Sequence, residues 1–180
     1  MKVIDTFFSD VKIIEPTLYK DERGFFYESY NEREFNKIIE RDVTFVQDNR
    51  SLSTKNTIRG LHFQPKKPQA KLIQVLSGKI YDVTVDLRAA SPTKGQWFGR
   101  ILEAEENISL WIPEGFAHGF LALSDNTEIL YKASDYYDPE NQGTLLWNDP
   151  VLSIDWPLIG EPIVSKKDKE GLFFSEIIFM

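Results

Sequence analysis

The residues of this 180-residue sequence whose types best suit chemistry are its two histidines, His62 and His118. His62 stands in the string Arg59-Gly60-Leu61-His62-Phe63-Gln64, and His118 stands in Pro113-Glu114-Gly115-Phe116-Ala117-His118-Gly119-Phe120. An unperturbed imidazole titrates at about pH 6.5, so either side chain could exchange a proton at neutral pH. Two histidines and a distant acid could also hold a metal ion. The residues alone leave both chemistries open.

The composition limits the classes of function that are open to the chain. With 21 Lys and Arg against 28 Asp and Glu, the net charge is −7, which argues against general nucleic-acid binding because that requires a broad basic surface. The absence of Cys excludes disulfides, thiolate metal sites and a cysteine nucleophile. No apolar run approaches the roughly 20 residues of a membrane helix, and Asp5 comes too early for a signal peptide. We therefore expect a cytoplasmic protein without a membrane segment, folded as one domain over residues 1–180.

The elements that must position these residues are mostly strands. Two strands are predicted between Lys71 and Arg88, separated by a turn at Ser77-Gly78. In the second strand, one face is apolar: Tyr81, Val83, Val85 and Leu87. The opposite face carries two acids: Ile80, Asp82, Thr84 and Asp86. A strand with polar groups on the face opposite its apolar face can line water or a ligand cavity.

Further strands and one helix complete the predicted architecture. The strands are expected at Ile108–Ile112, Gly119–Leu123 and Glu128–Lys132, with turns between them. The helix is expected from Asn31 to Asp42, because Asn31 suits an N-cap and Glu34 follows three residues later. Many short strands with one helix predict an antiparallel sandwich or barrel, and such barrels can hold a small ligand.

The string that ends at His118 contains Pro-x-Gly-x-x-His, which resembles the second sequence motif of the cupin superfamily. Cupins are jelly-roll barrels built as a double-stranded β-helix, which agrees with the predicted strands. The resemblance implies a mainly β jelly-roll barrel with one or two short helices. Metal-binding cupins carry a His-x-His pair in their first motif, whereas this sequence has His62 followed by Phe63 and Gln64. We therefore expect a pocket without a metal ion.

A more specific resemblance covers about residues 20 to 168. Strings that occur in the same order resemble the dTDP-4-dehydrorhamnose 3,5-epimerase family: Asp21–Phe26, Phe45–Asn49, Arg59–Gln64, Ser91–Thr93, Pro113–Phe120, Tyr131-Lys132 and Trp147–Pro150. Any one string alone would be a weak signal, but together they are specific. The resemblance implies conversion of dTDP-4-dehydro-6-deoxy-glucose to dTDP-4-dehydro-L-rhamnose without a cofactor, on the pathway to dTDP-rhamnose.

Four residues fit this chemistry by the resemblance. Epimerisation at C3 and C5 beside the C4 ketone requires a base, a group that stabilises the enolate oxygen, and an acid across the ring. His62 matches the base, and Asp168 matches the carboxylate that fixes its tautomer. Lys71 matches the lysine that stabilises the enolate. Tyr131 matches the proton donor, which suits a phenol because its pKa of about 10 keeps it protonated at neutral pH.

The nucleotide must be held as well, because a pyrophosphate carries two negative charges and requires Arg or Lys. The resemblance implies these substrate-binding residues: Arg23, Glu28, Gln47, Asn49, Arg59, Asp82, His118, Tyr137 and Lys167. Tyr137 is expected to stack on the thymine ring, and Asp82 is expected beside His118. A homodimer is also implied, in which the N-terminal strands carry Arg23 and Glu28 to the partner's site. Gln142 departs from some relatives, which have a glutamate at this ligand-binding position.

Alternative functions remain open at this point. The protein could epimerise only C3 or only C5 of a similar dTDP-sugar, or it could bind a sugar nucleotide without catalysis. A metal-dependent cupin oxygenase that uses both histidines is a further alternative. Single residues also have structural interpretations: Tyr131 as a half-buried strand tyrosine, His118 as a hydrogen-bonded core histidine and Asp82 as a solvent-facing acid.

Overall fold

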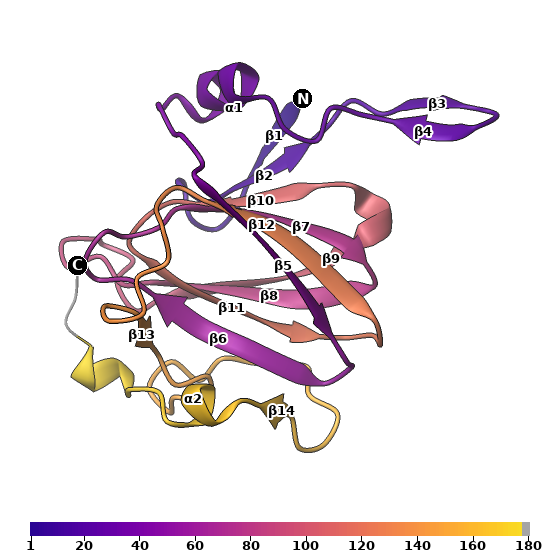
Figure 1. The fold of residues 1–180 in the computed structure, drawn as a ribbon. Coiled ribbons are helices and arrows are strands. Elements are labelled where there is room, and N and C mark those ends of the chain that lie inside the picture. The colour runs from indigo at the N-terminus through magenta and orange to yellow at the C-terminus, as the bar shows by residue number, and fades with distance from the viewer. Residues whose placement is uncertain (178–180) are drawn as a thin grey trace.

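The computed structural model of the chain describes residues 1–177, and its strands form two sheets that face each other (Figure 1). The first sheet has six strands in this spatial order: β1 (Lys2–Asp5), β2 (Lys12–Glu15), β10 (Ser109–Ile112), β7 (Lys71–Ser77), β12 (Thr127–Ala133) and β5 (Gln47–Ser53). All neighbouring strands of this sheet pair antiparallel.

The second sheet has this spatial order: β13 (Gly143–Thr144), β6 (Thr57–Phe63), β11 (Phe116–Ala122), β8 (Lys79–Asp86) and β9 (Trp97–Glu103). A short strand, β14 (Ile163–Val164), pairs parallel with β6. A separate hairpin of β3 (Tyr19–Asp21) and β4 (Gly24–Phe26) projects away from the body of the molecule (Figure 1). Short 3-10 turns lie at Ala104–Glu106 and Phe174–Glu176.

Aliphatic and aromatic side chains from both sheets fill the space between them. Ile73 and Leu110 come from the first sheet, and Ile80 and Phe120 come from the second. Each of these side chains is buried, and burial of such surface from water is the main force that holds the layers together. The predicted fold class is confirmed: the chain is mainly β, with two facing sheets and short helices.

Two further clusters cover the outer faces of the sheets. Helix α1 (Glu32–Ile39) packs Phe35 against Trp111 on the outer face of the first sheet, with ring centroids 5.2 Å apart. The C-terminal segment, which includes α2 (Lys166–Lys169), packs Leu145 and Trp156 against the outer face of the second sheet. Both faces of the second sheet are therefore buried, and the C-terminal segment is held beneath β6 (Figure 1).

The one helix that the sequence predicts is present but ends earlier than expected. Asn31 is its N-cap, as predicted, and its side chain accepts a hydrogen bond from the backbone N–H of Glu34. The helix ends at Ile39 rather than at Asp42, because Glu40 adopts a left-handed conformation with φ 55°. Across residues 1–177, no helix combines the length and the apolar character that a membrane span requires.

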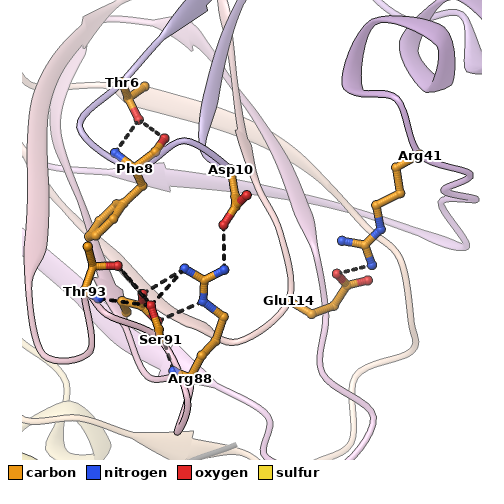
Figure 2. A network of polar contacts seen from close by, with 9 residues as sticks. Thr6, Phe8, Asp10, Arg41, Arg88, Ser91, Thr93 and Glu114 are labelled. Carbon is orange, nitrogen blue, oxygen red and sulfur yellow. Dashed lines mark hydrogen bonds and ion pairs between the residues drawn. The ribbon is translucent and has the colours of Figure 1, made fainter.

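A polar network ties the N-terminal segment to the connection between β8 and β9. Arg88 binds Asp86 and, through Nη1, the carboxylate of Asp10 at 2.6 Å, and the hydroxyls of Ser91 and Thr93 donate to Asp86 (Figure 2). Asp86 is fully buried. Burial would raise its pKa, but the hydrogen bonds from Arg88, Ser91 and Thr93 outweigh burial and lower the pKa to about 2. Asp86, which the strand pattern places on the same face as Asp82, is therefore the central acceptor of this network.

Replacing Asp86 with alanine should lower the free energy of unfolding by about 1–3 kcal/mol, because Arg88, Ser91 and Thr93 would lose the buried carboxylate that accepts their hydrogen bonds. Urea denaturation at pH 7 measures this loss. The folded-state pKa lies below the ordinary value, so the stabilisation by Asp86 is present above about pH 4 and is lost as the pH falls towards 2. The difference between wild type and variant should therefore shrink over that range.

Glu114→Ala is the matched control, because Glu114 also pairs with an arginine, Arg41, but near the surface (Figure 2). Its loss should cost about 0–1 kcal/mol. Equal losses in Asp86→Ala and Glu114→Ala would contradict a special role for the buried carboxylate.

Candidate active site

A cavity of about 560 Å³ lies between the sheets and is lined by residues of β5, β6, β7, β11, β12 and β14 and of α2. Its volume is typical of pockets that bind small molecules. The predicted site residues that line it are Arg59, His62, Lys71, His118, Tyr131, Tyr137, Lys167 and Asp168, together with Gln142. Positions up to 109 residues apart in the sequence are thus brought to one cavity.

His62 and Asp168 form a hydrogen-bonded pair at this cavity. His62 lies on β6, and its Nε2 is 2.7 Å from Oδ1 of Asp168 on α2. The second carboxylate oxygen accepts a hydrogen bond from the backbone N–H of Gly60. Ser165 caps α2 by accepting from the Asp168 backbone N–H, which orients the short helix. The sequence resemblance alone pointed to this pairing, and the structure now places the two residues in contact.

The pair holds an ionised carboxylate against an imidazole. Burial would raise the pKa of Asp168, but the hydrogen bonds from His62 and the Gly60 backbone outweigh burial and lower it. Because a carboxylate can only accept, Nε2 of His62 carries the hydrogen and Nδ1 keeps a free lone pair. The His62 side chain remains 31% exposed, so this lone pair belongs to a group that a ligand can reach.

A second His–Asp pair lies on the neighbouring strands. His118 on β11 is the register partner of His62 on β6, and its Nε2 is 2.7 Å from Oδ2 of Asp82 on β8. Both residues are buried. Burial lowers the pKa of His118, against the opposing effect of Asp82, so His118 is neutral at pH 7. The solvent-facing interpretation of Asp82 is therefore wrong, because β8 turns this face towards the interior.

Lys71 and Tyr131 come from the first sheet, opposite the strands that carry the histidines. Lys71 begins β7, and burial lowers its pKa to about 8, while Asp82 opposes that decrease. At neutral pH Lys71 is therefore mostly an ammonium ion. Tyr131 lies on β12, and burial raises the pKa of its phenol, so it stays protonated.

The rim of the cavity carries hydrogen-bonding and cationic groups. The Tyr137 hydroxyl donates to Oε1 of Gln142 at 2.9 Å, and the Lys167 ammonium binds the same oxygen. Arg59 donates to the Ser53 hydroxyl and a neighbouring carbonyl. Gln142 is thus held between two rim groups, where a glutamate would form an ion pair with the lysine.

Five predicted binding residues do not line this cavity, and one of them is Asp82, which contacts it only through His118. Gln47 and Asn49 are hydrogen-bonded to each other on β5, and Gln47 accepts from the backbone N–H of Tyr137, so it supports the rim from behind. Arg23 lies in the projecting hairpin and is paired with Asp21. Glu28 follows that hairpin and does not line the cavity either.

Sequence reasoning missed several residues that line the cavity, among them Ser51, Phe120 and Ser165. Ser51 lines it from β5, and its hydroxyl is buried without a hydrogen-bond partner among residues 1–177. Phe120 supplies an apolar wall from β11. Ser165 caps the helix that carries Asp168, and the Ser-x-x-Asp spacing was the signal that could have revealed it. No comparable local signal marks Ser51, whereas Phe120 is the last residue of the Pro113–Phe120 string.

Comparison with known proteins supports one family. A sequence model described as dTDP-4-dehydrorhamnose 3,5-epimerase matches residues 5–176. The chain is 54% identical over 169 residues to the dTDP-4-dehydrorhamnose 3,5-epimerase of Salmonella typhimurium, which covers 93% of this chain and 92% of that protein. It is 48% identical over 176 residues to the Pseudomonas aeruginosa enzyme of the same name, covering 98% and 97%.

The fold leads to the same family. The crystal structure of a dTDP-6-deoxy-D-glucose-3,5-epimerase from Legionella pneumophila, in complex with dTDP-4-keto-L-rhamnose, superposes with a TM-score of 0.95 at 46% identity. That match covers 98% of this chain and 94% of the other. Likeness over this length in both sequence and structure goes well beyond a shared cupin barrel. The chain therefore belongs to the dTDP-4-dehydrorhamnose 3,5-epimerase family of isomerases.

Proposed function

We propose that this protein epimerises dTDP-4-dehydro-6-deoxy-glucose at C3 and C5, to give dTDP-4-dehydro-L-rhamnose, through enolates formed in the cavity between the sheets. The observation that carries the proposal is the meeting of a His62–Asp168 pair with Lys71 and Tyr131 at one cavity. The mechanism uses side chains of the chain itself and no cofactor. We infer a cytoplasmic enzyme, in keeping with a chain that has no cysteine.

His62 acts as the base in this mechanism. Each C–H that must be broken lies next to the C4 ketone, so its removal produces an enolate. With Nε2 hydrogen-bonded to Asp168, Nδ1 is the nitrogen that accepts the proton. The imidazolium that forms is stabilised by the ionised carboxylate, as in other His–Asp pairs.

Lys71 stabilises the enolate oxygen. Negative charge develops on the C4 oxygen as the proton leaves, and an ammonium group in a partly buried cavity stabilises such charge more strongly than water does. The pKa of about 8 leaves Lys71 mostly charged at neutral pH. A lysine in this form can donate to the oxygen without taking a proton from the substrate.

Tyr131 returns a proton from the side opposite His62. The two residues lie on different sheets, β12 and β6, and both line the cavity between those sheets. A sugar ring bound there would have the imidazole on one side and the phenol on the other. Inversion requires this arrangement, because removal and return of the proton must occur on opposite faces of the ring.

The rim residues hold the nucleotide. Arg59 and Lys167 are positioned to bind the pyrophosphate, which a protein with a net charge of −7 can attract only through local cations. Tyr137 is 48% exposed and can offer its ring to the thymine. Gln47 and Asn49 support this rim through their hydrogen bonds.

The projecting hairpin suggests that the protein acts as a homodimer. Tyr19, Phe25 and Phe26 on β3 and β4 are between 58% and 70% exposed, and the hairpin extends away from the body (Figure 1). Exposed aromatic groups of this kind mark interaction sites. We infer that the hairpin packs against a second copy and brings Arg23 and Glu28 to that copy's cavity.

Deuterium incorporation tests the activity. The purified protein, incubated in D₂O with the substrate and a metal chelator, should place two deuterons in the sugar, and chemical reduction should give a rhamno-configured product. Mass spectrometry counts the deuterons. One deuteron would indicate a mono-epimerase, and none, with the nucleotide still bound, would exclude the enolate mechanism.

Tyr131→Phe should slow epimerisation more than it weakens binding, since the phenol acts on the intermediate.

His62→Ala should reduce kcat by about 10²–10⁴-fold and leave the Kd for dTDP nearly unchanged, because the base acts on the sugar rather than on the nucleotide. Asp168→Asn should also lower kcat, since the pair loses the charge that stabilises the imidazolium. Glu105→Gln, on an exposed turn, is the control and should behave as wild type. Substantial residual turnover in His62→Ala would remove His62 as the base.

Complementation tests the dimer. Arg23→Ala should raise KM for the dTDP-sugar, and His62→Ala should leave at most about 1% of kcat. In mixed dimers of the two variants, the cavity with intact His62 would receive an intact hairpin from the other chain. Equal mixing should therefore restore about a quarter of the sites, by the statistics of a two-fold dimer. Strictly additive activity, or a monomer by light scattering, would contradict the shared site.

A further inference from the structure

Gln142 joins two rim residues of the cavity through a single oxygen atom. Its Oε1 accepts a hydrogen bond from the Tyr137 hydroxyl at 2.9 Å and a second hydrogen bond from the ammonium group of Lys167. All three residues line the cavity between the sheets. Gln142 directly precedes β13, whereas Lys167 lies on α2, so one side chain connects two separate segments of the rim.

The group that holds Lys167 is neutral, which sets this lysine apart from many cations of the protein. Five of the seven arginines pair with a carboxylate, among them Arg41 with Glu114, so ion pairs are a common arrangement in this acidic chain. Lys166, the neighbour of Lys167, pairs with Glu170. Lys167 itself has no carboxylate of residues 1–177 within 4.0 Å of its ammonium group.

Arg59, the other cation at the rim, is held in the same way. Its guanidinium donates to the hydroxyl of Ser53 and to the backbone carbonyl of Leu52, and both of these acceptors are uncharged. The rim therefore anchors its two cations without an ion pair. Their positive charge remains available to an anionic ligand, which matters in a protein whose net charge is −7.

We propose that Gln142 is a positioning residue for nucleotide binding: its neutral amide holds Tyr137 and Lys167 at the rim and leaves the full charge of Lys167 to the pyrophosphate. A carboxylate at this position would accept the same two hydrogen bonds, but it would neutralise the ammonium group and repel the phosphate oxygens. The amide oxygen fixes the ammonium group without that loss of attraction. This inference rests on the assignment of the rim to the nucleotide in the proposed function.

Gln142→Glu tests the neutral amide, because the two side chains have nearly the same shape and differ in charge. Calorimetric titration with dTDP at low ionic strength should give a Kd about tenfold above that of wild type. The difference should shrink in about 0.5 M NaCl, since salt screens charges near the surface. Thymidine, which carries no phosphate, should bind the variant and wild type equally well in an NMR titration.

Gln96→Glu is the matched control, because it adds the same charge at an exposed position that does not line the cavity. Its Kd for dTDP should stay within about twofold of the wild-type value. Turnover provides a readout that general damage to the fold would not reproduce. Gln142→Glu should raise KM for the dTDP-sugar by about tenfold and leave kcat near its wild-type value, because Gln142 acts on the nucleotide rather than on the reacting sugar.

Gln142→Met tests the anchoring role separately, since it removes both hydrogen bonds without adding a charge. Binding of thymidine and of dTDP should each weaken by about threefold, because Tyr137 and Lys167 lose their shared acceptor. Unchanged binding of both ligands in this variant would overturn the positioning role.

The binding measurements also separate this proposal from the proposed function. An equal Kd for dTDP in wild type and Gln142→Glu, or an equal loss of thymidine and dTDP binding in that variant, would overturn the role of the neutral amide and leave the epimerase function standing. Wild-type protein that binds no dTDP would instead reject the proposed function, and the role of Gln142 with it.

Discussion

Placing two carboxylates inside a hydrophobic β-sandwich is the constraint on which the cavity depends. Removal of a charged or polar group from water is costly unless it is hydrogen-bonded, and burial by itself would raise the pKa of Asp168. Each carboxylate is instead met by an imidazole Nε2 at 2.7 Å, and Asp168 also accepts from a backbone N–H. The same hydrogen bonds occupy Nε2 of each histidine and leave Nδ1 as the other ring nitrogen. The contact that satisfies each carboxylate therefore also determines which histidine nitrogen can accept a proton.

The topology of the second sheet meets this constraint. β6 and β11 are antiparallel neighbours, and their register places His62 directly opposite His118. β8 is the next strand and brings Asp82 to His118 from one side. Asp168 reaches His62 from the other side because the C-terminal segment packs its apolar residues under the sheet. Apolar packing on the outer face thus positions the His62–Asp168 pair at the cavity, and loss of that packing would disturb the pair as well as the stability of the fold.

The two sheets contribute different chemistry to the cavity. The second sheet supplies the imidazoles, whereas the first supplies Lys71 and Tyr131. A ligand between the layers is therefore bounded by proton acceptors on one side and by proton donors on the other. Separation of this kind follows from the sandwich itself, because residues that face each other across the interior belong to different sheets. The neutral state of His118 and the charged state of Lys71 follow from how deeply each is buried and from their shared neighbour Asp82.

The sequence by itself determined five of the strands, between Lys71 and Lys132, together with the helix cap at Asn31 and the family, because strand alternation, capping and short motif strings are local properties of the chain. It could identify Asp82 and Asp86 as acids on one face of a strand, but not that one would meet His118 and the other Arg88. Only the tertiary structure decided those pairings, and likewise the contact between His62 and Asp168, which lie 106 residues apart. The physical reason is that such contacts depend on strand register and on packing of the C-terminal segment, and neither is encoded within a short stretch of sequence.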